Sequence, residues 1–355
     1  MRKNYSNLTR NIRGRLNPEG LPLTKAFSDE LGSIAYSDVL TYIRSAMKGV
    51  GPEYTQRSKE AGEKVKDHLR TVLDGITYKY QGSVMTDTHI KGHSDIDLLT
   101  ITEKFYSWDK TRVEEIVGNH GERQKFWQTD IDKLERKVRN FSAYQGNIYR
   151  DLRDVRLKSE SKLSEVYLDC DVSKPKSIRI TNRSLRRDVD VVTANWYDDV
   201  TSIINDFGEY RGVQVYDKDL NQKGSPDYPF TSILRINERS SQTNGRLKKM
   251  IRFLKNCKAD SLVEVKLSSF DINAICYDIK VDEYRHSAFY ELVPVLYRQL
   301  KNICQYDSVA DNIVSVDGRE YIFRGNEPKK NDLRRLLSEV EGVYLDLQEN
   351  RLLTI

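Results

Sequence analysis

Residues 82–98 read GSVMTDTHIKGHSDIDL, and this stretch decides the fold. Residues 95–102 alternate and branch as a β-strand does, so Asp95 and Asp97 point to the same face of that strand. Two neighbouring carboxylates repel each other unless a cation neutralises them, and Mg²⁺ prefers carboxylates together with phosphate oxygens as ligands. The pair therefore predicts a magnesium site. An Asp-x-Asp alone is also common on solvated strands and turns, so its context has to decide.

A short strand and a glycine turn precede the pair. Residues 77–81 read as a strand, and Gly82 and Ser83 follow it directly. A glycine lets the backbone approach a phosphate, and a hydroxyl with nearby amides can bind the phosphate oxygens. A triphosphate could then bridge the turn at Ser83 and a metal bound to the two aspartates.

A third carboxylate comes from a later strand, residues 188–194, which begins DVDVV. Asp190 has apolar neighbours, which suggests that this strand crosses the core, and a buried aspartate needs a partner such as a metal. Asp188 lies on the same face of the strand and is the alternative third ligand.

At this point the chain resembles a known family. Gly82-Ser83, four residues, Thr88, five residues and then Ser94-Asp95-Ile96-Asp97-Leu98 is similar to the signature of the polymerase-beta-like nucleotidyltransferases. It is most similar to the branch that contains cyclic GMP-AMP synthase, oligoadenylate synthetase and their bacterial antiphage relatives. The resemblance implies that Gly82, Ser83, Thr88 and Ser94 bind the nucleotide. His93 lies beside the motif and is assigned no role.

The same branch supplies its third metal carboxylate from a strand that reads roughly Asp-Val-Val-Pro-Ala. Residues 190–194 read DVVTA, with Thr193 in place of the proline. The resemblance therefore implies that Asp95, Asp97 and Asp190 are the metal ligands and the catalytic carboxylates.

The family also places a lysine on a helix, and a serine-aromatic pair after it, to hold the triphosphate and to stack on a base. Lys255 and the pair Ser269-Phe270 match these features. Lys248, Arg252 and Lys255 form one basic stripe at helical spacing. Such a stripe is usually a solvated face, but this one lies between the two matched segments, so we expect it to face the nucleotide.

The strands fall in the first two thirds of the chain and helices dominate the rest. Further strands are expected at residues 176–181 and 213–216, and helices at residues 25–47, 54–73, 130–167 (with a break near 145–146), 246–255, 271–278, 288–303 and 331–340. We predict an α+β fold of the polymerase-beta-like type. Its mixed-sheet palm lobe with N-terminal helices, residues 1–220, would pack against a helical lobe, residues 221–355, with the active site in the cleft.

Composition limits the other functions. The 355 residues are 38% hydrophobic and 31% charged, as in ordinary globular proteins, and no apolar run approaches the roughly 20 residues that span a bilayer. We expect a cytoplasmic protein without a membrane segment, whose four cysteines are structural thiols.

The first eighteen residues are basic and weakly resemble a transit peptide. The net charge of +5 permits a polyanionic partner without requiring one, and acids interleave the bases of residues 130–167, which favours a solvated helical face over a nucleic-acid surface.

The resemblance implies an enzyme that uses two Mg²⁺ ions, with Mn²⁺ as an alternative, and ATP, GTP or other nucleoside triphosphates. Its products would be cyclic or linear oligonucleotide second messengers in bacterial antiphage defence. It does not require a nucleic-acid activator and admits a regulatory protein partner. The alternative is a nucleotidyltransferase that modifies RNA ends, a protein or a small molecule. A catalytically inactive binding module is disfavoured because all three expected carboxylates are present.

Overall fold

The computed structural model describes residues 3–19, 38–92 and 95–350, and the chain divides into two compact units. The helical unit comprises Met1–Gln56, Ser83–Ser94 and Arg235–Ile355, and the sheet unit comprises Arg57–Gly82 and Asp95–Leu234. This grouping differs from the predicted lobes at three places. Residues 1–56 and residues 83–94 belong to the helical unit, and residues 221–234 belong to the sheet unit.

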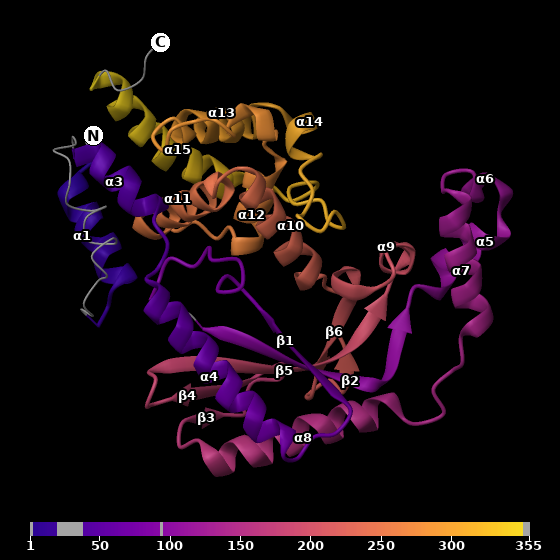
Figure 1. Ribbon diagram of the computed structural model, residues 1–355. Helices are drawn as coiled ribbons and strands as arrows, with labels where there is room; N and C mark the ends of the chain where they lie inside the picture. Colours follow the sequence, from indigo (N-terminus) through magenta and orange to yellow (C-terminus); the bar gives the residue numbers. More distant parts are fainter. Residues whose placement is uncertain (1–2, 20–37, 93–94, 351–355) are drawn as a thin grey trace. The chain divides into compact units, whose positions relative to one another are not determined.

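A mixed sheet forms the centre of the sheet unit, and the predicted α+β class is confirmed (Figure 1). In the described residues its order is β1-β2-β5-β4-β3, and β6 pairs with both β5 and β7. Among the described strands β2 and β5 are parallel to each other, and the other pairs are antiparallel. The strands are β1 (Ile76–Gln81), β2 (Ile96–Trp108), β3 (Cys170–Asp171), β4 (Ile178–Asn182), β5 (Arg187–Asp198), β6 (Gly212–Asp217) and β7 (Gln222–Lys223).

The parallel pair β2 and β5 is buried by apolar residues on both faces. Leu99 and Ile101 of β2 form one apolar cluster with Val192 and Ala194 of β5. Side chains two apart on a strand share a face, so Asp97 and Asp190 continue these two apolar rows toward the strand starts. The register that buries the apolar side chains therefore also places the two aspartates.

Helices cover the sheet and extend its far end (Figure 1). Helix α8 packs on the sheet through Leu152, which contacts Phe105 and Tyr216, whereas α5, α7 and α9 share a separate small core. The helical stretch predicted at residues 130–167 is two helices, α7 and α8, and Asn147 caps the second by accepting from the Arg150 amide at 2.9 Å. The helices of this part are α4 (Pro52–Arg70), α5 (Lys110–Gly118), α6 (His120–Arg123), α7 (Gln128–Asn140), α8 (Ile148–Val166), α9 (Val200–Ile204) and the 3₁₀ helix η1 (Gly208–Tyr210).

Helix α11 is the centre of the helical unit, because it is buried along most of its length and packs on α3, α12 and α15. The helix expected from residue 25 is described only as α3, since residues 20–37 lie outside the described part. The helices are α1 (Tyr5–Leu16), α3 (Asp38–Met47), α10 (Pro229–Gln242), which begins in the sheet unit, α11 (Arg246–Asp260), α12 (Ser269–Asp278), η2 (Val281–Glu283), α13 (Leu292–Gln305), α14 (Asp307–Ala310) and α15 (Glu327–Glu349). None of the helices in the described ranges is long and apolar enough to cross a membrane.

Helix α1 was not predicted, although it has a regular buried face. Tyr5, Thr9, Ile12 and Leu16 are its buried residues, at spacings of four, three and four. Only two of the four are aliphatic, and the basic residues of this segment instead gave it a weak resemblance to a transit peptide.

The start of α12 allows a stability prediction that separates two adjacent serines. Ser268 is the N-cap of α12, where its hydroxyl accepts from the Asp271 amide at 3.1 Å and the Asp271 carboxylate accepts from the Ser268 amide at 2.7 Å. Ser268→Ala should therefore lower the free energy of unfolding by about 1 kcal/mol. Chemical denaturation checks this value. Ser269→Ala is the matched control, because Ser269 is exposed and lies outside the capping box; an equal loss in both variants would contradict the prediction.

Candidate active site

One row of polar side chains crosses the sheet and contains two of the predicted carboxylates. The strand register pairs Gln81 with Asp97, Asp97 with Asp190, Asp190 with Arg179 and Arg179 with Asp171. Residues directly opposite on neighbouring strands point to the same face of a sheet. Asp97 and Asp190 are therefore neighbours although they are far apart in the sequence.

Arg179 of β4 lies among the carboxylates. Its Nη2 donates to Asp95 Oδ2 at 2.8 Å and to Asp188 Oδ2 at 2.7 Å, and its Nη1 is 3.7 Å from Asp190 Oδ2. The hydrogen bond to Asp188 raises the pKa of Arg179 above its usual value, and the charges of Asp95 and Asp190 act in the same direction. One guanidinium thus links three carboxylates, including both candidates for the third metal ligand.

Sequence reasoning missed Arg179, although a signal for it was present. Residues 176–181 and 188–194 were both predicted as strands with a short basic turn between them. An antiparallel hairpin through that turn pairs Asn182 with Arg187, and counting back along it places Arg179 opposite Asp190.

Two of the aspartates, Asp97 and Asp190, are partly buried, and burial raises the pKa of both carboxyl groups. Burial, then the charges of Asp190 and Asp95, raise the pKa of Asp97 to about 6. Burial also raises the pKa of Asp190, against the opposing effects of Lys174 and Arg179. Asp190 Oδ1 is buried and has no hydrogen-bond partner among the described residues. These features create a demand for positive charge beside Asp97 and Asp190.

Gly82 lies beside the Asp97 carboxylate. Its φ is +93°, a conformation that side chains disfavour, and a Cβ at this position would lie 3.1 Å from Asp97 Oδ2. Only glycine therefore fits the turn and leaves this side of the Asp97 carboxylate open.

These observations allow a test of whether the site fits a divalent cation. In the described ranges, no three His, Cys, Asp or Glu side chains are grouped as a metal site as they stand, and Arg179 lies among the candidates. However, the unpartnered Asp190 Oδ1, the raised pKa of Asp97 and the open side left by Gly82 all suit a cation with oxygen ligands. Asp95, Asp97 and Asp190 are the residues that would hold it.

The predicted nucleotide-binding residues Ser83 and Thr88 lie on a compact turn in the helical unit. The Ser83 carbonyl accepts from the Thr88 amide at 3.0 Å and from the Thr86 hydroxyl at 3.2 Å. Thr88 is fully buried, and its hydroxyl lies 2.8 Å from that of Thr86. Ser94, the fourth residue of the signature, lies outside the described residues.

Helix α11 anchors this turn through two buried cations. Lys255 Nζ donates to Thr88 O at 3.1 Å and to Thr88 Oγ1 at 3.2 Å. Arg252 donates to the carbonyl oxygens of Asp87 at 2.7 Å and Met47 at 2.8 Å. The basic stripe was expected to face the nucleotide directly, whereas these two side chains are buried and hold the backbone of the segment that carries Ser83 and Thr88.

Burial among neutral partners lowers the pKa of Lys255. Desolvation lowers the pKa of Lys255 to about 8, and the positive charges of Arg252 and Lys258 act in the same direction.

His89 is a further anchor of the turn that the sequence analysis did not predict. Its Nε2 is 3.2 Å from the Thr55 hydroxyl. Burial lowers the pKa of His89 to about 4.

Ser269 and Phe270 form the first turn of α12. Ser269 is exposed, and Phe270 is half-buried against the core of the helical unit. Their predicted contact with a nucleotide stays a prediction.

The pKa of Lys255 predicts how nucleotide affinity depends on pH. Lys255 carries its proton below about pH 8, so affinity for a non-hydrolysable triphosphate should fall about tenfold between pH 7 and pH 9. Titration calorimetry measures this change. Lys255→Met should bind weakly with no such step, and a wild-type affinity that is flat over the range would contradict the prediction.

The same pKa has a consequence for stability with a definite sign. The folded pKa lies below the unfolded value of 10.5, so the unfolded state binds the proton more tightly. The free energy of unfolding should therefore rise as the pH increases from about 8 toward 10, and Lys255→Met should lack this rise.

Known proteins resemble this chain over nearly its full length. The family model of the cGAS/DncV-like nucleotidyltransferase C-terminal helical domain matches residues 235–345. A curated relative, the c-di-GMP synthase of Capnocytophaga granulosa, is 53% identical over 353 residues, which cover 98% of this chain and 99% of the relative.

Two solved structures are similar to this chain in fold as well as in sequence. The STING-associated CdnE c-di-GMP synthase of Flavobacteriaceae sp. is 41% identical with a TM-score of 0.90, covering 99% of this chain and 100% of that one. The STING-associated CdnE c-di-GMP synthase of C. granulosa is 48% identical with a TM-score of 0.80, covering 98% of this chain and all of that one.

Proposed function

Since the chain belongs to the cGAS/DncV-like nucleotidyltransferases and synthesises cyclic oligonucleotides from nucleoside triphosphates, we propose that its product is cyclic di-GMP, made from GTP. The observation that carries this proposal is the 53% identity to a c-di-GMP synthase over nearly the full length of both chains. A second relative with that name, from a Lachnospiraceae bacterium, is 41% identical over 97% of this chain. Base selectivity depends on the shape of the whole pocket, which such extended similarity tends to preserve.

The proposed roles of the carboxylates rest on the family resemblance and on the two-metal mechanism of phosphoryl transfer. Asp95 and Asp97 would hold a metal with the donor triphosphate, and Asp190 would complete the ligands on the acceptor side. Two Mg²⁺ ions, or Mn²⁺ in their place, would neutralise the triphosphate and lower the pKa of the acceptor hydroxyl. The chain itself concentrates negative charge at Asp97 and Asp190, where burial makes the charge costly without a cation.

The remaining residues would bind the nucleotide. Gly82 and Ser83 would place backbone amides and a hydroxyl against the leaving pyrophosphate, with Thr88 and Ser94 completing the loop. Lys255 would fix this loop from within and supply positive charge. Ser269 would bind polar groups of the nucleotide and Phe270 would stack on a base.

The biological setting is proposed from the relatives. Both solved c-di-GMP synthases above are described as STING-associated, which supports a signalling role for the product in bacterial antiphage defence. A cytoplasmic location and a regulatory protein partner stay predictions.

Product analysis tests the proposal. With GTP alone and Mg²⁺, the enzyme should form a product with the mass of two GMP units less two waters that resists phosphatase, because a ring has no terminal phosphate. Addition of the other three triphosphates should leave this product dominant. A mixed-base ring would overturn the assignment of GTP, and labelling only of added RNA or protein would overturn synthesis of a messenger.

Asp97→Asn tests the carboxylate assignment. The substitution should reduce turnover at least a hundredfold, or about 2.7 kcal/mol of barrier, because it removes one negative charge without changing the volume. Asp169→Asn is the matched control, since Asp169 pairs only with exposed Arg183 in the described residues and should keep full activity. Turnover within about tenfold of wild type would remove Asp97 from the proposed site.

The stability of Asp97→Asn provides an independent measurement. The folded pKa of about 6 lies above the unfolded value, so ionisation of Asp97 destabilises the fold as the pH rises from about 4 through 6. In chelating buffer at pH 8 the variant should melt at or above the wild-type temperature, and the difference should shrink toward pH 4.

A further inference from the structure

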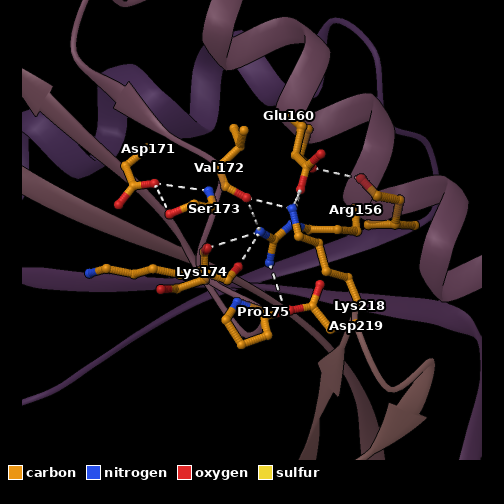
Figure 2. A network of polar contacts seen from close by, with 12 residues as sticks. Arg156, Glu160, Asp171, Val172, Ser173, Lys174, Pro175, Lys218 and Asp219 are labelled. Atoms are coloured by element: carbon orange, nitrogen blue, oxygen red, sulfur yellow. Dashed lines mark hydrogen bonds and ion pairs between the residues drawn. The ribbon is translucent and has the colours of Figure 1, made fainter.

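A buried arginine on α8 shapes a loop next to the carboxylates. Arg156 is 1% exposed, and its Nε donates to Glu160 Oε1 at 2.8 Å. Its Nη2 donates to Lys174 O at 2.8 Å and Ser177 O at 2.9 Å, with longer bonds to Val172 O and, through Nη1, to Pro175 O (Figure 2). The guanidinium therefore gathers four carbonyl groups of one loop, residues 172–177.

Two further contacts close this network. Lys218 donates to Glu160 Oε1 at 2.9 Å and to the Val172 carbonyl, and its backbone amide donates to Pro175 O at 3.0 Å. Asp171 Oδ1 accepts from the amide of Ser173 at 2.8 Å and from its hydroxyl at 2.6 Å, which fixes the entry to the loop. The backbone of the loop is thus specified from both ends and from its centre.

The inward carbonyls direct one side chain of the loop toward the carboxylates. Figure 2 shows the Lys174 side chain extending away from the Arg156 guanidinium. Its Nζ lies 3.9 Å from Asp190 Oδ1, the buried oxygen that has no hydrogen-bond partner among the described residues. The loop then continues into β4, which carries Arg179 opposite Asp190.

We propose that Arg156 is a positioning residue for the reaction, because it holds residues 172–177 so that Lys174 lies against Asp190. Lys174 places positive charge beside that carboxylate, on the proposed acceptor side of the site. The inference rests on the proposed role of Asp190 in the site. It concerns residues that no motif marks, since neither Arg156 nor Lys174 belongs to the signature of the family.

A purely structural role for the network makes a different prediction. Removal of Arg156 leaves several carbonyl groups without their donor and costs stability in either case. Lys174, however, is 41% exposed and its ion pair is long, so replacing it should hardly change the stability. An effect of Lys174 on the reaction therefore separates positioning from folding.

The first experiment compares two lysines of the same loop. Lys174→Met should lower kcat about five- to twentyfold with KM within about twofold and an unchanged melting temperature, because chemistry rather than binding loses an interaction. Lys174→Arg should restore most of the rate. Lys176→Met makes the same change of charge at an exposed position two residues away and should behave as wild type. Pyrophosphate release from a mixture of four triphosphates measures all variants without depending on base selectivity.

The second experiment tests whether Arg156 acts through Lys174. Arg156→Lys keeps the charge but cannot reach the four carbonyls, and it should lower kcat by a factor similar to that of Lys174→Met. In the Lys174→Met background the same substitution should lower kcat less than twofold further, because coupled residues are not additive. Independent, multiplicative effects would overturn the positioning role.

Other outcomes of the same series are also decisive. Lys174→Met with wild-type kcat would overturn the inference even if Arg156→Lys fails to fold. Asp190→Asn is assayed in parallel: if it keeps turnover, the assignment of Asp190 fails, whereas loss in Asp190→Asn with no loss in Lys174→Met refutes only the positioning role.

Discussion

The parallel pairing of β2 with β5 is the constraint on which the candidate site depends. It places Asp97 opposite Asp190, and its register is fixed by Leu99, Ile101, Val192 and Ala194 on the same face. A slip of one residue would move one of these apolar rows, together with its aspartate, to the opposite face of the sheet, so the packing of the apolar side chains enforces the approach of two like charges. Arg179 and Lys174 lie beside Asp190, with side-chain nitrogens 3.7 and 3.9 Å from its carboxylate oxygens, and partly offset this repulsion.

In the helical unit, buried cations hold the backbone of the turn that contains Asp87 and Thr88, rather than a group of carboxylates. Asp87 has a positive φ of 51° and Thr88 is completely buried, so this segment needs donors for its inward carbonyls. Arg252 and Lys255 supply them from successive turns of α11. Arg252 also lies 3.5 Å from the Asp87 carboxylate, whereas the partners of Lys255 are a carbonyl and a hydroxyl. Lys255 therefore keeps its net charge, which is useful beside a loop proposed to bind a triphosphate.

The sequence predicted which aspartates meet on the sheet better than it predicted the residues that support them. Asp97 and Asp190 could be found because carboxylates on apolar strands are unusual, and the α+β class followed from the change of pattern after residue 220. The position of Arg179 opposite Asp190 follows from the hairpin register, although no motif marks this residue. The roles of Arg252 and His89 could not be predicted, because they depend on a turn whose carbonyl directions no residue pattern encodes. The grouping of α1 and α3 with the C-terminal helices is likewise set by long-range packing on α11.

Arg156, Arg252 and Lys255 share one physical arrangement, in that each is buried and donates mainly to backbone carbonyls of a loop. Burial of a charge is expensive, and apolar replacements of buried ionic groups are often neutral or stabilising. Stability alone is therefore a poor reason for three such cations in one chain. Their common product is a loop with a defined backbone, and Lys255, which has no carboxylate partner among the described residues, also retains its positive charge. Both properties suit an enzyme whose substrates are polyanions, because a fixed field does not have to reorganise when the triphosphate reacts.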